Sequence, residues 1–204
     1  MDPSRHWERV YRTKAADQVS WFRPHLETSL AWIERYAPDR DARVIDVGGG
    51  QSTLVDDLIA RGYRRITVLD ISQAAIDTTR ARVGNVGAGV EWVACDVTCA
   101  ELPAGAYDVW HDRAVFHFLT AAEDRAAYVK QVRHSLKRGG HLIIATFGPE
   151  GPTKCSGLDV CRYDAASLSR EFGADFRLIE NVKEVHRTPS GASQQFLYCC
   201  FAFD

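Results

Sequence analysis

The stretch Arg43-Val-Ile-Asp-Val-Gly-Gly-Gly-Gln-Ser-Thr-Leu54 decides the fold of this chain. Its first five residues are mostly apolar and predict a buried strand, which ends in three glycines and is followed by a helix. A glycine turn lets a ligand lie against bare backbone, and the first N–H groups of a helix have no partner within it. The stretch is therefore typical of a ligand-binding strand–turn–helix unit.

A second apolar strand, Ile66-Thr-Val-Leu-Asp70, ends in an acid. An acid at the tip of the strand that follows a glycine turn is placed to bind both hydroxyls of a ribose. The two strands together predict a nucleoside-containing cofactor across the carboxyl ends of a parallel sheet. The alternative is an ordinary strand–helix turn with two solvated acids.

The pattern around the glycines distinguishes between nucleotide cofactors. Dinucleotide-binding turns need G-x-G-x-x-G, whereas Gly48, Gly49 and Gly50 are followed by no third spaced glycine. Asp46 lies two residues before the first glycine, where its carboxylate would repel a pyrophosphate. A cationic ligand with an ammonium and a sulfonium group suits it better, so the pattern disfavours a dehydrogenase.

The Asp46-x-Gly48-x-Gly50 form resembles the first motif of class I S-adenosylmethionine (SAM) methyltransferases. The resemblance implies SAM as cofactor, S-adenosylhomocysteine as product, and a Rossmann-like α/β fold. That fold has a seven-stranded, mainly parallel sheet with a C-terminal antiparallel hairpin and helices on both faces. The cofactor-binding residues that we expect are Asp46, Gly48, Gly49, Gly50, Asp70, Ile71, Asp96, Val97 and Trp21.

Some of these roles follow from the resemblance alone. Asp96 and the N–H of Val97 follow the third strand, where an acid and an amide meet the adenine ring in this family, and Ile71 would lie against the adenine face. The alternative for Asp96 is that it caps the next turn.

Strands and helices alternate along the chain, as in a mainly parallel α/β domain. We expect further strands at 90–94, 107–110 and 141–147, and an antiparallel pair at 176–186 and 194–203. We expect one helix over Leu26–Ala37, a second over residues 54–59, and a third from a Ser72 cap to about Val83. A fourth starts at a Thr120–Glu123 capping box and runs to about Leu136, where Gly139-Gly140 close it. A fifth, short helix lies between an Asp164 cap and Gly173. Residues 148–158 are expected to form a loop.

Composition restricts the kinds of protein that remain. A chain of 204 residues with 46% hydrophobic content suits one domain, 1–204. It has no apolar run long enough for a bilayer, no apolar region of a signal peptide, and a net charge of −2. We expect a cytoplasmic protein with neither nucleic acid nor membrane as a partner; the oligomeric state stays open.

The six cysteines form no C-x-x-C pair, and Cys199 and Cys200 should point to opposite faces of a strand. We therefore expect reduced cysteines and no metal site.

The N-terminal segment, residues 1–38, carries aromatic residues ahead of the core. Trp7, Tyr11, Trp21 and Phe22 either form a lid that excludes water from the cofactor or pack a helix pair on the sheet. The W-x-x-x-Y helix followed by a Trp near a proline resembles the start of thiol methyltransferases and of one group of protein lysine methyltransferases.

The fourth strand leads into Trp110-His-Asp-Arg-Ala-Val-Phe-His-Phe-Leu119, which should face the transferred methyl group. This segment resembles thiopurine-type methyltransferases, which carry Trp-Asp-Arg-Gly-Ala there, although the glycine is absent. Lysine methyltransferases tend to carry Asp-Lys-Gly-Thr.

The candidate catalytic residues lie in this segment. Arg113 is expected to stabilise an anion or tie the structure, His117 is the candidate base, and His111 is a second candidate. Each histidine has a structural alternative, and Asp112 has the alternative of pairing with Arg113.

Cys155 is the cysteine of interest, since Lys154 beside it would favour the thiolate, although it is also an ordinary loop residue. We expect a SAM-dependent methyltransferase that acts on a small molecule, on sulfur or a similarly soft atom. The alternatives are a protein lysine methyltransferase and a SAM-binding module without catalysis.

Overall fold

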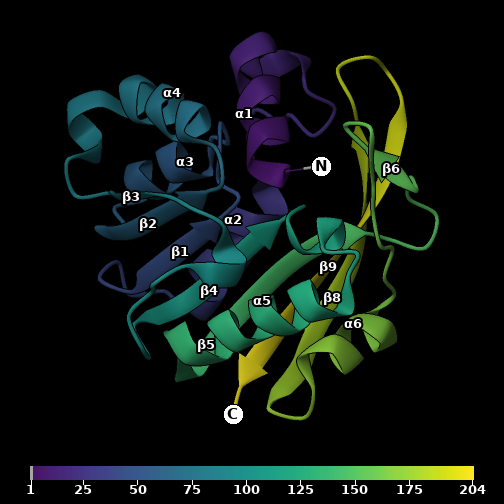
Figure 1. Ribbon diagram of the computed structural model, residues 1–204. Helices are drawn as coiled ribbons and strands as arrows, with labels where there is room; N and C mark the ends of the chain where they lie inside the picture. The colour runs from purple at the N-terminus through teal and green to yellow at the C-terminus, as the bar shows by residue number, and fades with distance from the viewer. Residues whose placement is uncertain (1) are drawn as a thin grey trace.

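A seven-stranded sheet forms the centre of the computed structural model, which describes residues 2–204 (Figure 1). The strand order is β3-β2-β1-β4-β5-β9-β8. Strands β1 to β5 pair in parallel, and β9 pairs antiparallel with both β5 and β8, which confirms the predicted fold class. The strands are β1 Arg43–Val47, β2 Arg65–Asp70, β3 Glu91–Ala94, β4 Tyr107–Arg113, β5 Leu136–Phe147, β8 Phe176–Arg187 and β9 Ser193–Phe203.

Helices cover both faces of this sheet, and a further helix lies across its carboxyl edge (Figure 1). One face carries α2 Glu27–Tyr36, α3 Leu54–Ala60 and α4 Gln73–Val83, and the other carries α5 Ala122–Ser135 and α6 Ala165–Phe172. The helix at the edge is α1, Pro3–Thr13. The short elements are η1 Ala16–Gln18, η2 Gly84–Gly87, η3 Val97–Cys99, η4 Phe116–Phe118, β6 Lys154–Cys155 and β7 Leu158–Asp159.

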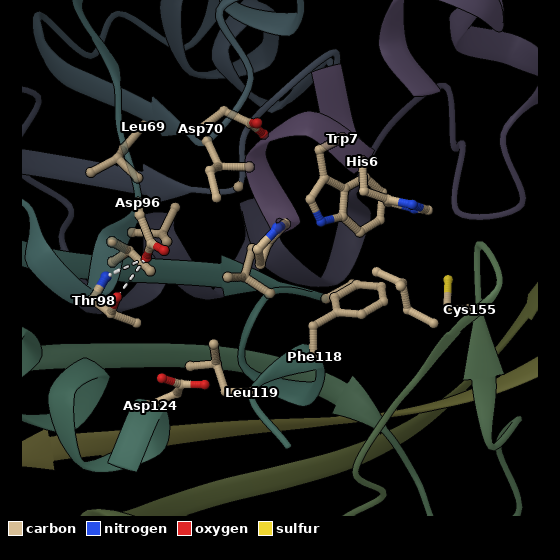
Figure 2. A pocket seen from close by; sticks show the side chains of 18 of the residues that line it. His6, Trp7, Leu69, Asp70, Asp96, Thr98, Phe118, Leu119, Asp124 and Cys155 are labelled. Atoms are coloured by element: carbon tan, nitrogen blue, oxygen red, sulfur yellow. Dashed lines mark hydrogen bonds between the residues drawn. The ribbon is translucent and has the colours of Figure 1, made fainter. Parts of the chain in front are cut away.

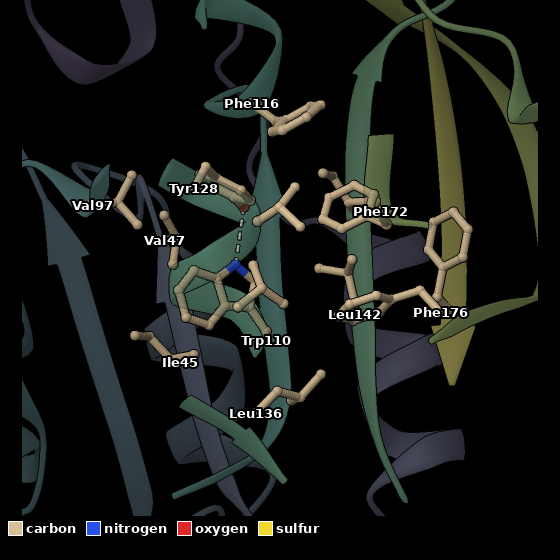
Figure 3. Close-up of a cluster of buried hydrophobic side chains, with 14 of the residues drawn as sticks. Ile45, Val47, Val97, Trp110, Phe116, Tyr128, Leu136, Leu142, Phe172 and Phe176 are labelled. Carbon is tan, nitrogen blue, oxygen red and sulfur yellow. Dashed lines mark hydrogen bonds between the residues drawn. The ribbon is translucent and has the colours of Figure 1, made fainter. Parts of the chain in front are cut away.

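Two apolar layers result, because alternate residues of a strand point to opposite faces. Figure 3 shows the layer under α5 and α6, where Trp110, Tyr128 and Phe172 pack together. Cys199 lies in this layer and Cys200 in the other, as the sequence predicts for adjacent strand residues. None of the six cysteines forms a disulfide among residues 2–204.

A buried polar chain crosses the layer in Figure 3. The Trp110 Nε1–H donates to the Tyr128 hydroxyl at 2.9 Å, and this hydroxyl donates to Asp112. Asp112 also accepts the backbone N–H groups of Val115 and Phe116, so it shapes the turn after β4. Burial raises its pKa to about 6. The alternative that Asp112 pairs with Arg113 is therefore wrong.

The predicted helix starts have different outcomes. Ser72 caps α4, and Asp164 forms a capping box with Ser167 at α6. The capping box at Thr120 and Glu123 is wrong: α5 starts after Ala121, which has no side-chain cap, so Thr120 lies one residue too early. Arg125 stabilises the segment that precedes α5 by donating hydrogen bonds to the carbonyls of Leu119 and Thr120.

Two features of the strands also differ from expectation. Strand β5 begins at Leu136, directly after α5, so Gly139 and Gly140 lie inside a strand and do not close the helix. The expected loop at 148–158 contains β6 and pairs it with β7. No helix within residues 2–204 has the length and apolar character needed to cross a membrane.

Candidate functional site

A cavity of about 630 Å³ lies at the carboxyl ends of the parallel strands (Figure 2). Residues that follow β1, β2 and β3 line one part of it, among them Gly48, Asp70 and Asp96. Helix α1 and the β6–β7 pair line the other part, with Trp7 and Cys155. The topology therefore brings most of the sequence-predicted site residues to one cavity.

The three glycines form a turn with no room for side chains. Gly48 has a φ of +70°, and an added Cβ would lie 2.0 Å from Val115 Cγ2. A Cβ at Gly49 would lie 2.7 Å from Asp46 Oδ2, and one at Gly50 would lie 2.7 Å from the Tyr11 hydroxyl. Side chains at these positions would displace Val115, Asp46 or Tyr11, so the packing of this turn requires glycine.

Asp70 lies at the end of β2, is only 4% exposed, and lines the cavity. Its Oδ1 accepts the Ser72 N–H at 2.9 Å. Burial, together with the negative charge of Asp46, raises the pKa of Asp70 to about 7, although hydrogen bonds from backbone N–H groups oppose the shift. A buried carboxylate without a cation beside it suits a ligand that brings hydroxyl donors and positive charge.

Asp96 follows β3 and also lines the cavity, together with Ile71 and Val97. Its Oδ1 accepts the N–H of Thr98 at 2.8 Å and its hydroxyl at 2.7 Å (Figure 2). Asp96 therefore caps η3, as the alternative interpretation required, and still faces the cavity.

Asp46 and His111 are neighbours on β1 and β4, and this pairing corrects the expectation for His111. The register places the two residues opposite each other, and His111 Nδ1 lies 2.7 Å from Asp46 Oδ1. The other ring nitrogen lies 2.9 Å from the Ser29 hydroxyl of α2. Because both nitrogens have partners, His111 holds Asp46 in place and is not available as a base.

The Asp46–His111 pair lies outside the large cavity. It lines a neighbouring space of about 40 Å³, which also reaches Gly48 and Gly49. Asp46 therefore lies beside Gly49 at this smaller space, whereas Asp96 lines the large cavity.

Arg113 lies where the two cavities meet. Its Nε donates to the Tyr198 hydroxyl and its Nη1 to the Trp21 carbonyl, while the guanidinium lies 4.5 Å from the centre of the Phe196 ring. The remaining nitrogen, Nη2, is buried and has no partner among residues 2–204. Arg113 is thus a structural tie with one unused donor.

His117 is not at the cavity, which corrects its expected role as the base. The side chain is fully buried, and Nδ1 accepts the Phe147 N–H at 3.1 Å. Burial, with a smaller contribution from the charge of Arg113, lowers its pKa to about 3. His117 therefore supports the end of β5 as a neutral ring.

Cys155 lines the large cavity, but its expected thiolate character is wrong. Burial raises the pKa of the thiol to about 11. Lys154 points elsewhere and pairs with Asp159, because adjacent strand residues face opposite sides. Cys155 is therefore a neutral soft group in the cavity wall.

The N-terminal residues both cover the cavity and pack against the core. The Trp7 ring lies 5.6 Å from Trp21 and 5.0 Å from Phe118, with edges meeting faces. Glu8 fixes α1 to the start of α4, since its Oε2 accepts the Ser72 hydroxyl at 2.7 Å and the Ala74 N–H at 3.1 Å. Side chains of this segment therefore line the cavity and also pack against neighbouring elements.

Sequence reasoning missed two residues of this segment, His6 and Glu8. His6 lines the large cavity and is 8% exposed. The only sequence feature that could have indicated them is their position next to Trp7, on a helix that precedes the core.

The donor set of the cavity fits SAM better than a metal ion. Asp70 and Asp96 offer acceptors for hydroxyl and amine groups, and the glycine turn offers bare backbone. Within residues 2–204, no group of three or more His, Cys, Asp or Glu side chains is arranged to hold a metal.

Comparisons with known sequences agree with this assignment. Residues 44–140 match the sequence profile of the methyltransferase domain family. EEF1A lysine methyltransferase 2 of Homo sapiens is 22% identical over 195 residues, which cover 87% of this chain and 75% of the human protein. The eEF1A lysine and N-terminal methyltransferase of Danio rerio is 25% identical over 148 residues; these cover 71% of this chain but only 21% of that much longer protein.

Solved structures share the fold. One, from work on the conversion of a disulfide bond into a thioacetal group during echinomycin biosynthesis, has a TM-score of 0.79 at 18% identity and covers 98% of this chain and 93% of its own. The 1,6-didemethyltoxoflavin-N1-methyltransferase of Burkholderia thailandensis, with bound 1,6-didemethyltoxoflavin and S-adenosylhomocysteine, has a TM-score of 0.69 at 19% identity and covers 97% and 83%. These solved structures show that the chain has the class I methyltransferase fold, and the profile match over residues 44–140, with the glycine turn, supports a SAM-dependent methyltransferase.

Proposed function

We propose that this methyltransferase acts on a small molecule and methylates sulfur or another soft atom. The observation that carries the proposal is Nη2 of Arg113, which has no partner among residues 2–204 and belongs to a cation that lines the same cavity as Trp7 and Phe118. A thiolate that forms near this guanidinium gains a charge-assisted hydrogen bond. The resemblance of the segment 110–119 to thiopurine-type enzymes points the same way.

The cofactor side of the proposal assigns one role to each residue. Asp70 binds the ribose hydroxyls, Asp96 and the N–H of Val97 bind the adenine, and Ile71 packs on its face. The glycine turn, 48–50, lies along the amino-acid part, with Asp46 toward the ammonium group. When bound, SAM supplies a methyl group on a positively charged sulfur.

Helix α1 and Trp21 supply the lid in this proposal. Trp7, Trp21 and Phe118 exclude water from the acceptor, which strengthens the interaction of Arg113 with a developing anion. The chain then acts by alignment and desolvation, and residues 1–204 form one domain in which 1–38 provide the cover.

Protein lysine methylation is the second candidate. Asp124 and Asp159 line the same cavity and would attract a lysine ammonium group. The human and zebrafish relatives are also named for lysine methylation of eEF1A. Against it stands the lining of the cavity, where Trp7, Trp21 and Phe118 favour an apolar acceptor.

A transfer assay separates these candidates. Methyl-labelled SAM is incubated with the protein and either small thiols, hydrogen sulfide, or a cell lysate. Label in a volatile or organic-extractable product supports sulfur methylation. Label in a protein band, with none in the small products, contradicts it and supports the lysine candidate. No transfer to any acceptor, with SAM bound, supports a non-catalytic module.

A further inference from the structure

His6 is a buried polar side chain without a hydrogen-bond partner among residues 2–204. Its side chain is 92% buried, and neither ring nitrogen has a hydrogen-bond partner among residues 2–204. Leaving a buried polar atom unpaired is unfavourable, because the atom loses its hydrogen bonds to water. His6 also lines the large cavity, so a rotation of its ring would bring a nitrogen to a molecule bound there.

The position of His6 belongs to the acceptor part of the cavity. Its ring meets Trp7 edge to face, with centroids 5.2 Å apart, and Trp7 in turn packs on Phe118. In Figure 2, His6 and Cys155 lie toward the opposite side of the view from Asp96. In this view Asp96, the residue assigned to adenine, is therefore separate from His6.

The surroundings of His6 keep the ring neutral. Burial lowers its pKa, and the positive charges of Arg9 and Lys14 lower it further. The other titratable groups around the cavity are Tyr11, Asp70, Cys95, Asp96, Arg113, Asp124, Cys155 and Asp159. At neutral pH one ring nitrogen is thus free to accept a proton.

We propose that His6 accepts the proton of the methyl acceptor, so that the acceptor class is a thiol or another nucleophile that carries a proton. This inference rests on the proposed function. The new bond joins the acceptor sulfur to the methyl carbon, and the bond from that carbon to the cofactor sulfonium breaks. The acceptor proton passes to His6 and then to water, so charge and atoms balance.

Two other histidines of the sequence do not compete for this role. Both nitrogens of His111 have partners, and His117 lies outside the cavity with one nitrogen bonded to backbone. Arg113 complements His6, since the guanidinium stabilises the thiolate that remains after proton removal.

The test compares wild type with His6→Gln and His6→Ala, using labelled SAM and a simple alkanethiol at pH 7 and pH 9.5. At pH 7 we expect both variants to lose at least about 100-fold in kcat, since general bases contribute 10²–10⁴-fold. At pH 9.5 the thiol ionises in solution, so the variants should regain most of this activity. Affinity for S-adenosylhomocysteine should stay within twofold of wild type at both pH values.

His25→Gln serves as the matched control, because the His25 side chain is exposed, pairs with Asp57 and does not line the large cavity. An equal loss for the His6 variants at both pH values, or no loss at pH 7, overturns the role of His6. If wild type methylates protein lysines and no thiol, the proposal of sulfur methylation fails. In that case, loss of lysine methylation in the His6 variants that is restored at high pH still supports His6 as the proton acceptor.

Discussion

Asp70 combines two properties at the scale of a single residue: it is buried, and it is aimed at the proposed ribose site. The neighbouring carboxylate of Asp46 and the loss of water both favour its protonated form. A ligand with hydroxyl donors and a positive charge favours the ionised form instead. Binding and ionisation of Asp70 should therefore be coupled.

This coupling predicts a pH-dependent affinity. With a pKa of about 7 in the free protein, Asp70 is protonated at lower pH, so affinity for S-adenosylhomocysteine should fall by about tenfold per pH unit below 7 and level off above it. Calorimetric titration between pH 5.5 and 8.5 measures this slope. Asp70→Asn should bind weakly with no slope, whereas a constant wild-type affinity would contradict the role of Asp70.

The same shift has a consequence for stability in the absence of ligand. Between about pH 4 and pH 7 the folded chain holds a proton on Asp70 that the unfolded chain has lost. By linkage, the contribution of Asp70 to the free energy of unfolding falls as pH rises through this window. Ligand binding above pH 7 offsets that loss.

Single residues also show where sequence reasoning stops. Asp46, Gly48 and Asp70 were predictable, because strand ends and glycine spacing fix their place. His111 and His117 look equivalent in the sequence, yet one faces Asp46 and the other faces the backbone of Phe147. Their roles depend on register and on the turn shaped by Asp112, which no local pattern encodes.

At the scale of elements, the attachment of α1 to α4 governs the closure of the site. Glu8 accepts hydrogen bonds from the start of α4, directly after Asp70, and these bonds lower its pKa. The carboxylate also lies near the positive end of the α4 dipole. One side chain thus links the lid to the helix that follows the ribose residue.

Glu8→Ala should loosen α1. Loss of a capping interaction costs about 1 kcal/mol, which corresponds to about fivefold weaker binding of S-adenosylhomocysteine. Hydrogen exchange should increase in residues 3–13 while the sheet stays protected. Arg5→Ala is the matched control on the same helix, since its side chain is 90% exposed; similar exchange in both variants would contradict the attachment.

Most elements could be read from the sequence because periodicity and caps agree, as at Ser72 and Asp164. The exceptions are elements set by tertiary contacts. The β6–β7 pair is two residues per strand and has no alternation to detect, and α5 starts without a side-chain cap. The attachment through Glu8 joins segments 64 residues apart, so no local pattern predicts it.

At the scale of the whole molecule, the layer under α5 and α6 fixes the C-terminal hairpin to the parallel strands. Phe172 is fully buried there, with ring centroids 5.3 Å from Phe116, 5.4 Å from Phe176 and 5.7 Å from Phe201. Four elements therefore meet at one ring, and the turn after β4 is among them.

Phe172→Ala should lower the free energy of unfolding by about 3–5 kcal/mol, through lost burial and the cavity it leaves. Urea unfolding should show a lower midpoint with an unchanged slope. Val86→Ala, at a site that is 73% exposed, should change the free energy by less than about 0.5 kcal/mol. A loss below about 1 kcal/mol for Phe172→Ala would contradict this packing.

The central claim, a SAM site built on the glycine turn and Asp70, is tested most directly by calorimetric titration at pH 8. Wild type should bind S-adenosylhomocysteine with one site per chain and micromolar affinity, Asp70→Ala should bind it at least tenfold more weakly, and NAD should not bind to either. Binding of NAD without binding of S-adenosylhomocysteine, or an unchanged affinity in Asp70→Ala, would contradict the claim.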